Sequence, residues 1–160
     1  MISADSFSSE SPIWIYQSDR VFTDVECEQI TKELKSFLTQ WTSHGQTLKA
    51  EAHIFHNIFI VFIVESTVEL PSGCSIDSSV HLVKELEKSL GVDFFNRLNI
   101  CYRSDDQLYI HPLSEIKKAV VYGNVLGSFA VEKYGLAGLL EVKKSDINKR
   151  VKLYEKMIRF

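Results

Sequence analysis

Hydrophobic and polar positions follow a distinct pattern in each successive segment of the first hundred residues. Ile13 to Tyr16 are β-branched or aromatic, which is typical of a short strand. Thr23 and Glu26 have the spacing of a capping box and predict the start of a helix. Apolar residues recur at helical spacing on one face of that helix; they are Ile30, Leu34, Phe37, Leu38 and Trp41.

Two adjacent strands are predicted after a loop from Thr42 to Thr47. Apolar and polar side chains alternate from Leu48 to Ile54, which indicates a strand with one side towards solvent. His56-Asn57 suits a two-residue turn because asparagine tolerates positive φ. Every residue from Ile58 to Val64 is apolar, so we expect this strand at the centre of a sheet with both faces covered.

A second helix and a hairpin are predicted next. A loop from Ser66 to Ser75 leads into the helix, which starts near Ile76 and ends at Gly91. Leu98 to Arg103 and Gln107 to His111 then form a hairpin around the turn Ser104-Asp105-Asp106. The apolar face of the helix comprises Ile76, Val80, Val83 and Leu90.

The remaining residues are predicted to extend this core. Pro112 suits the first turn of a third helix, which Gly123 ends. Residues 124–144 favour a further hairpin, and Asp146 caps a final helix. The apolar face of that last helix comprises Ile147, Val151, Tyr154 and Ile158.

The order of these elements predicts an α+β fold. The sequence β-α-β-β-α-β up to Arg103 is the ferredoxin-like arrangement, with a C-terminal hairpin and helix as an extension. We expect residues 1–12 to be a flexible arm and residues 13–160 a single domain. A ferredoxin-like sheet carries helices on one face, whereas Ile58 to Val64 is apolar on both. The C-terminal segment or a second subunit must cover the other face, which favours a homodimer.

Composition narrows the classes of function. The 160 residues include 18 basic and 21 acidic side chains, so nothing favours binding to nucleic acid or anionic lipid. We expect no signal peptide and no membrane span, because the longest apolar run is far below roughly 18 residues. Cys27, Cys74 and Cys101 cannot all pair and match no zinc pattern. A cytoplasmic protein without a metal or cofactor is expected.

The predicted topology brings two loops together at one end of the sheet. Residues in the two central strands should pair where their numbers sum to about 113, which places His44 opposite residue 69. The second helix points its positive end at this place, lowers the pKa of a nearby thiol and attracts anions. The candidate site residues are Trp41, His44, Gly45, Gly73, Cys74, Ser75 and Asp77.

This neighbourhood allows several interpretations. The first is a binding module in which backbone N–H groups, His44 and Trp41 hold a small or anionic ligand. The second is a thiol-dependent enzyme with Cys74 as nucleophile and His44 as base. The third is a structural or interaction protein that dimerises through its sheet face. A purely structural alternative also exists, in which Ser75 caps the helix and Cys74 is a small buried hydrophobe.

Other motifs carry weaker signals. His53 and His56 are spaced like a ligand pair, but residues three apart on a strand face opposite sides. Arg97 is a candidate for anion binding at the opposite end of the sheet. Residues Gly123 to Ser128 look like a phosphate loop but lack the lysine and the spacing of a P-loop.

Three short motifs resemble a family of small, uncharacterised bacterial proteins that are often labelled as ABC transporter ATPases. They are Trp41-x-x-His44-Gly45-x-x-Leu48, Gly73-Cys74-Ser75-Ile76-Asp77 and Phe95-x-Arg97. The resemblance covers roughly Ile13 to Tyr102. It implies no activity, and the ATPase label would need a Walker motif, which this chain lacks. It does favour a site at Cys74 and His44, because these loops carry the family pattern.

Overall fold

The computed structural model describes residues 7, 11–65, 70–96, 98–104, 107–112 and 124–126. It divides the chain into two compact units, Met1–Phe95 and Asn96–Phe160, and each is described by itself. Helices and antiparallel sheets are both present, so the fold is α+β. The prediction of one domain over residues 13–160 stays a prediction.

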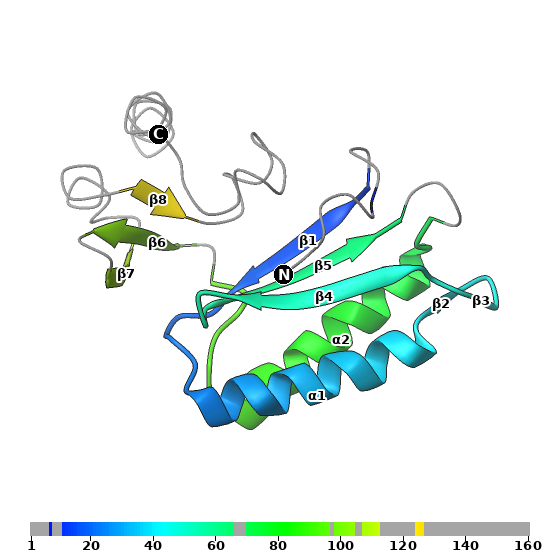
Figure 1. The fold of residues 1–160 in the computed structure, drawn as a ribbon, viewed down its shortest axis with the longest axis horizontal. Helices are drawn as coiled ribbons and strands as arrows, with labels where there is room; N and C mark the ends of the chain where they lie inside the picture. The colour runs from blue at the N-terminus through cyan, green and yellow to red at the C-terminus, as the bar shows by residue number, and fades with distance from the viewer. Residues whose placement is uncertain are drawn as a thin grey trace. The chain divides into compact units, whose positions relative to one another are not determined.

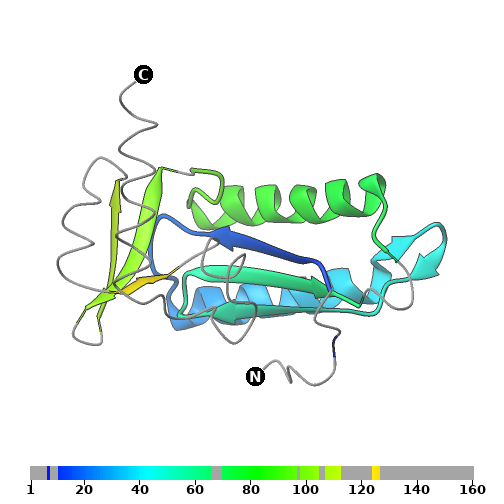
Figure 2. The same ribbon diagram turned by 90° about the horizontal axis from the view of Figure 1, so that it is seen from above.

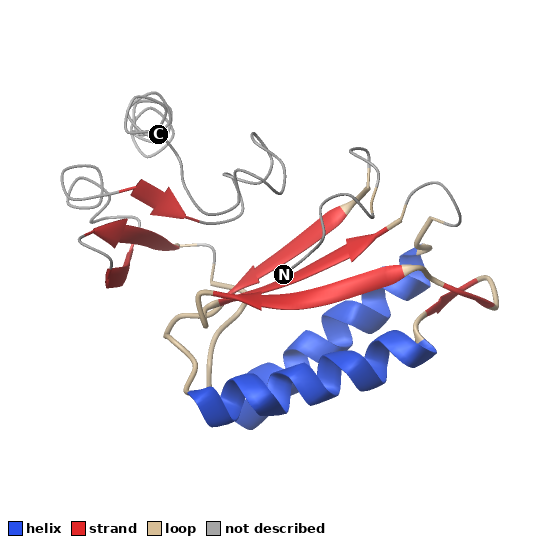
Figure 3. Ribbon diagram, viewed as in Figure 1, coloured by secondary structure: helices blue, strands red, loops and turns tan. Residues whose placement is uncertain are grey.

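The first unit is a three-stranded antiparallel sheet with two helices on one face (Figures 1 and 3). The strands are β1 (Ile13–Gln17), β4 (Ala50–Phe55) and β5 (Phe59–Val64), in the order β1-β5-β4. The helices are α1 (Asp24–Gln40) and α2 (Gly73–Leu90). The view from above shows both helices running lengthwise along the strands (Figure 2). In the part of the chain that the structure describes, no helix has the length and apolar character needed to cross a membrane.

Strand β5 lies at the centre of the sheet, as its apolar run predicts. Its even-numbered side chains join the core formed with α1 and α2, and its odd-numbered side chains face the other way. Phe59, Val61 and Ile63 on that other face are 3%, 0% and 1% exposed in the single chain. What covers this face in solution was predicted to be the C-terminal segment or a second subunit, and both stay predictions.

The core between sheet and helices follows from the helical periodicity. Ile30 and Leu34 of α1 belong to the same buried cluster as Phe62 of β5. The buried stripe of α2 comprises Ser75, Ser79, Val83, Leu86 and Leu90. Ile76 and Val80, which were predicted to face inward, are only half-buried. The two serines can enter the core because both hydroxyls are hydrogen-bonded, Ser79 to the Ile76 carbonyl and Ser75 to the Thr42 carbonyl.

The hairpin between β4 and β5 turns at His56 and Asn57, as predicted. Both have positive φ, 53° and 54°, and the Ile58 N–H donates to the Phe55 carbonyl at 3.1 Å. Phe55 then pairs with Phe59, so partner numbers sum to 114 and not to the predicted 113. Ile58 is an extra residue between turn and ladder. This shift aligns the apolar side of β4 with the helix-facing side of β5, whereas a sum of 113 would have misaligned them.

The segment after α1 is a short hairpin where the sequence predicted a loop. Strands β2 (Thr42–Ser43) and β3 (Gln46–Thr47) pair on either side of His44 and Gly45. These two residues have φ values of 48° and 80°, which is the geometry of a two-residue turn that closes a hairpin. The hairpin lies at the same end of the unit as the start of α2 (Figures 1 and 2).

The second unit contains a sheet with the order β7-β6-β8. Strands β6 (Asn99–Ser104) and β7 (Gln107–Pro112) form the predicted hairpin, and β8 (Asn124–Leu126) pairs with the other edge of β6. The order β1-β5-β4 matches three strands of the ferredoxin-like arrangement, but the full ferredoxin-like order is not confirmed. The predicted third helix, the rest of the 124–144 hairpin, the final helix and most of the N-terminal arm lie outside the described residues.

Candidate functional site

Helix α2 begins earlier than predicted, and this changes the meaning of its first residues. Ser72 is the N-cap: the Ser75 N–H donates to the Ser72 hydroxyl, and the Ser72 N–H donates to the Ser75 hydroxyl, each at 3.2 Å. Gly73, Cys74 and Ser75 therefore form the first helical turn and are not a loop. The prediction of Ser75 as the cap was wrong because two serines in this segment compete for that position, and a reciprocal capping box favours the earlier one.

Ser75 joins the start of α2 to the end of α1. Its hydroxyl donates to the Thr42 carbonyl at 2.9 Å, while its own carbonyl accepts a 2.8 Å bond from the Trp41 indole N–H. The Ser43 hydroxyl donates to the Leu70 carbonyl at 3.0 Å, which ties the β2–β3 hairpin to the segment before α2. Trp41 is buried and packs its ring against Phe37 at a centroid distance of 5.1 Å. The structure thus brings Trp41 and Ser75 into direct contact.

The other predicted site residues are arranged differently. His44 and Gly45 are exposed at the tip of the β2–β3 hairpin, and their turn geometry accounts for the histidine-glycine pair. Gly73 and Cys74 are exposed on the first turn of α2. Among the described residues, no hydrogen bond joins the His44 imidazole to the Cys74 thiol. Cys74 and His44 as a catalytic pair stay a prediction.

A groove lies between α1 and α2 and opens to solvent. It consists of two adjoining hollows of about 430 and 600 Å³, which share Phe37, Ser78 and Leu82. We call this feature the interhelical groove. Trp41 and Asp77, both predicted as site residues, are part of its wall. The remaining lining residues are Glu33, Ser36, Gln40, Thr42, His81 and Glu85.

The charges along this groove are negative. Glu33 on α1 and Asp77 and Glu85 on α2 contribute carboxylates, and no lysine or arginine belongs to the described lining. His81 Nε2 lies 3.4 Å from Glu85 Oε1, and both side chains are largely exposed. Asp77, His81 and Glu85 follow each other at four-residue intervals, so they form a stripe along α2. Such a lining attracts positively charged groups and repels anions.

Sequence reasoning missed this groove, although the four-residue spacing on α2 was a usable signal. A run of acids on a helix is usually a solvated face, and only the packing of α1 beside α2 turns the stripe into the wall of a groove. The partly buried rings and methyl groups of Phe37 and Leu82 form its apolar floor.

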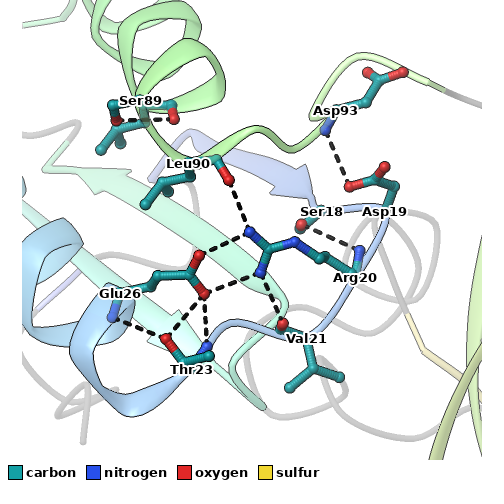
Figure 4. A network of polar contacts seen from close by, with 10 residues as sticks. Ser18, Asp19, Arg20, Val21, Thr23, Glu26, Ser89, Leu90 and Asp93 are labelled. Carbon is teal, nitrogen blue, oxygen red and sulfur yellow. Dashed lines mark hydrogen bonds and ion pairs between the residues drawn. The ribbon is translucent and has the colours of Figure 1, made fainter.

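A second network holds the opposite ends of the two helices (Figure 4). The Arg20 guanidinium donates to both carboxylate oxygens of Glu26, at 2.9 and 2.7 Å, and to the Leu90 carbonyl at 2.7 Å. Glu26 also accepts from the backbone N–H of Thr23 at 2.8 Å, which completes the predicted capping box. Arg20 and these hydrogen bonds lower the pKa of Glu26 to about 2. Arg20 thereby joins the start of α1 to the end of α2.

The remaining candidates lie on β4, in the turn after it, or largely outside the described residues. His53 lies in β4, where its Nε2 is 2.8 Å from Glu51 Oε2, and His56 lies in the adjacent turn. Within the described ranges, no group of three or more His, Cys, Asp or Glu side chains is placed to hold a metal ion. Arg97 lies outside the described residues.

The three cysteines are free thiols with different surroundings. Burial raises the pKa of Cys101 to about 12, and burial together with Asp24 and Glu26 raises the pKa of Cys27. Cys74 is the exposed one. It is therefore the thiol most open to a reagent from solvent.

No protein-family model, curated protein or solved structure matches this chain. The resemblance to a family of uncharacterised bacterial proteins thus stays a prediction.

Proposed function

We propose that the protein is a binding module and that the interhelical groove takes a ligand with a positive charge. The observation that carries this proposal is the lining of Glu33, Asp77 and Glu85 around an apolar floor. A cation about 4 Å from one carboxylate gains on the order of 1 kcal/mol in water and about 4 kcal/mol at a protein surface. Two or three carboxylates can therefore supply useful affinity.

The proposed ligand is positively charged, whereas the sequence predicts an anionic ligand at Gly73 to Asp77. The backbone N–H groups of the first α2 turn do favour anions, but the Ser75 N–H is already bonded to Ser72 and the Ile76 N–H to the Ser72 carbonyl. Two amides remain there without a helical partner, and Asp77 adds a negative charge one turn further on. The groove is the larger and more strongly charged feature.

A titration of the ¹⁵N-labelled full chain with spermidine, and separately with inorganic phosphate, tests the proposal. Spermidine should shift the backbone amide signals of Phe37, Ser78 and Leu82. The isosteric pair Glu33→Gln/Glu85→Gln should weaken this binding about tenfold, since it removes two ion pairs. The control pair Asp24→Asn/Glu28→Gln makes the same change in charge at exposed positions outside the groove and should leave binding unchanged.

Two other results would contradict the proposal. Phosphate shifts at the Gly73 and Cys74 amides, with no spermidine response in the groove, would favour the anion site that the sequence predicts. Equal weakening of spermidine binding in both variant pairs would mean that only net charge attracts it.

We also propose a cytoplasmic location, which the three free thiols support. Fractionation of cells that produce the protein, followed by detection with an antibody, tests it. Recovery in a compartment that forms disulfides would contradict the proposal.

A further inference from the structure

We infer that the occupant of the interhelical groove is a basic amphipathic helix of a partner protein. This inference rests on the proposed function and names the class of partner. It follows from the length of the groove, the spacing of its charges and the way its walls are held.

The groove is long in the direction of the helices. Its α1 wall runs from Glu33 to Trp41, and its α2 wall runs from Asp77 to Glu85, so each spans eight residue steps. At 1.5 Å per residue each wall is roughly 12 Å long, which is about two helical turns. A small molecule with one charge would contact only part of this length, whereas two turns of a helix match it.

The charge spacing of the groove fits a helical ligand as well. The carboxylates of Asp77 and Glu85 are two turns apart on α2, and Glu33 supplies negative charge on α1. Lysines or arginines that recur every three or four residues on a partner helix would meet these carboxylates on both walls. Apolar residues between them would rest on Phe37 and Leu82, as in other helix-in-groove complexes.

The walls are also held before any ligand arrives. Trp41 and Ser75 join the helices at one end, and Arg20 joins Glu26 to the Leu90 carbonyl at the other. Because hydrogen bonds join α1 and α2 at both ends of the helix pair, the distance between the helices is set before the ligand binds. Less conformational freedom is then lost on binding, which raises affinity for a ligand of matching shape.

The same charge argues against other macromolecules. Phosphates of nucleic acid and anionic lipid head groups would meet Glu33, Asp77 and Glu85 with like charge. An extended peptide that adds to a sheet is disfavoured too, because both walls are helices and offer no strand edge.

The probe for this inference is a synthetic lysine/leucine peptide of about 18 residues with the lysines on one helical face. A scrambled peptide of the same composition and a glutamate/leucine peptide are the controls. Binding to the full chain is measured by fluorescence anisotropy at about 0.15 M salt, where distant charges are screened. The amphipathic peptide should bind about tenfold more tightly than the scrambled one, and Glu33→Gln/Glu85→Gln should remove about tenfold of that affinity. Asp24→Asn/Glu28→Gln should change nothing.

The outcomes separate this inference from the proposed function. If spermidine shifts the groove amides but the amphipathic peptide binds no better than the scrambled one, the inference fails and the proposed function stands. If neither probe responds to Glu33→Gln/Glu85→Gln, both fail. Light scattering of the chain alone then measures self-association. Self-association that this variant abolishes would make a second copy the occupant and overturn the inference. Circular dichroism of each variant shows that it is folded.

Discussion

Replacing Arg20 by methionine removes the guanidinium that joins the two helices but keeps an apolar stem of similar length. The Arg20 side chain is 41% exposed and the Glu26 side chain is 19% exposed, so solvent weakens the ion pair between them. An exposed pair contributes about 0.2–1 kcal/mol, and the hydrogen bond from Arg20 to the Leu90 carbonyl, which the same exposure to solvent weakens, contributes about 1 kcal/mol more. We expect Arg20→Met to lower the free energy of unfolding of the first unit by about 1–2 kcal/mol.

Both tryptophans of the chain, Trp14 and Trp41, lie in the first unit, so their fluorescence in a urea titration reports the unfolding of that unit alone. The midpoint should fall without a change in the slope of the transition. Lys32→Met is the matched control, because it removes an exposed positive charge from α1 and should change stability by less than about 0.5 kcal/mol.

The pH dependence adds an independent check. The pKa of Glu26 is about 2 in the folded chain against 4.5 for an ordinary glutamate, so the unfolded chain takes up this proton first as pH falls. The stabilisation from Glu26 is therefore complete above about pH 5 and is lost as pH falls towards 2. The stability difference between the natural chain and Glu26→Gln should shrink over this range. A difference that stays constant from pH 6 to about pH 2.5, or an Arg20→Met chain as stable as the Lys32→Met chain, would refute this account of the network.

Three further predictions concern single residues. Trp41→Phe removes the indole N–H that donates to Ser75 and should cost about 1–3 kcal/mol in urea unfolding; an unchanged midpoint would show that this bond is dispensable. Gly91→Ala should lower the melting temperature, because an alanine at φ 62° costs about 1–2 kcal/mol even though its Cβ would meet no atom within 4 Å. Gly91→Asn should cost less stability than Gly91→Ala, and a larger loss for asparagine would contradict a conformational cause. Iodoacetamide on the native chain should modify Cys74 well before Cys101, as peptide mass spectrometry can show; faster labelling of Cys101 would contradict its burial.

Local patterns predict most of the first unit, because each depends on neighbours in sequence. The capping box of Thr23 and Glu26 and the apolar run of β5 both determine their elements through short-range chemistry. The errors arise where two near-equal options compete. Ser72 and Ser75 are equally good caps, and α2 starts at Gly73 and not near Ile76. Ile58 can either join the ladder or bulge out of it, and the partner numbers in β4 and β5 sum to 114 and not to 113.

The candidate site is less predictable than the fold because it depends on packing between elements. The sequence placed Trp41 and Ser75 close together through hairpin topology, and they are in contact. Nothing in the sequence says which outward faces of α1 and α2 become neighbours, so the acidic lining of the groove was not predicted. Likewise, a strand pattern in β6 does not specify which sheet it joins, and it pairs with β7 and β8.

The position of β5 between two strands has a consequence for the synthesis of the chain. Phe59–Val64 is a six-residue apolar run without a charge or proline, which is the composition of a segment that aggregates when it is left exposed. Its pairing partners, β1 and β4, both precede it in the chain. When a ribosome releases this run, the two strands that will shield its edges have already emerged, so the interval in which it could associate with another nascent chain is short.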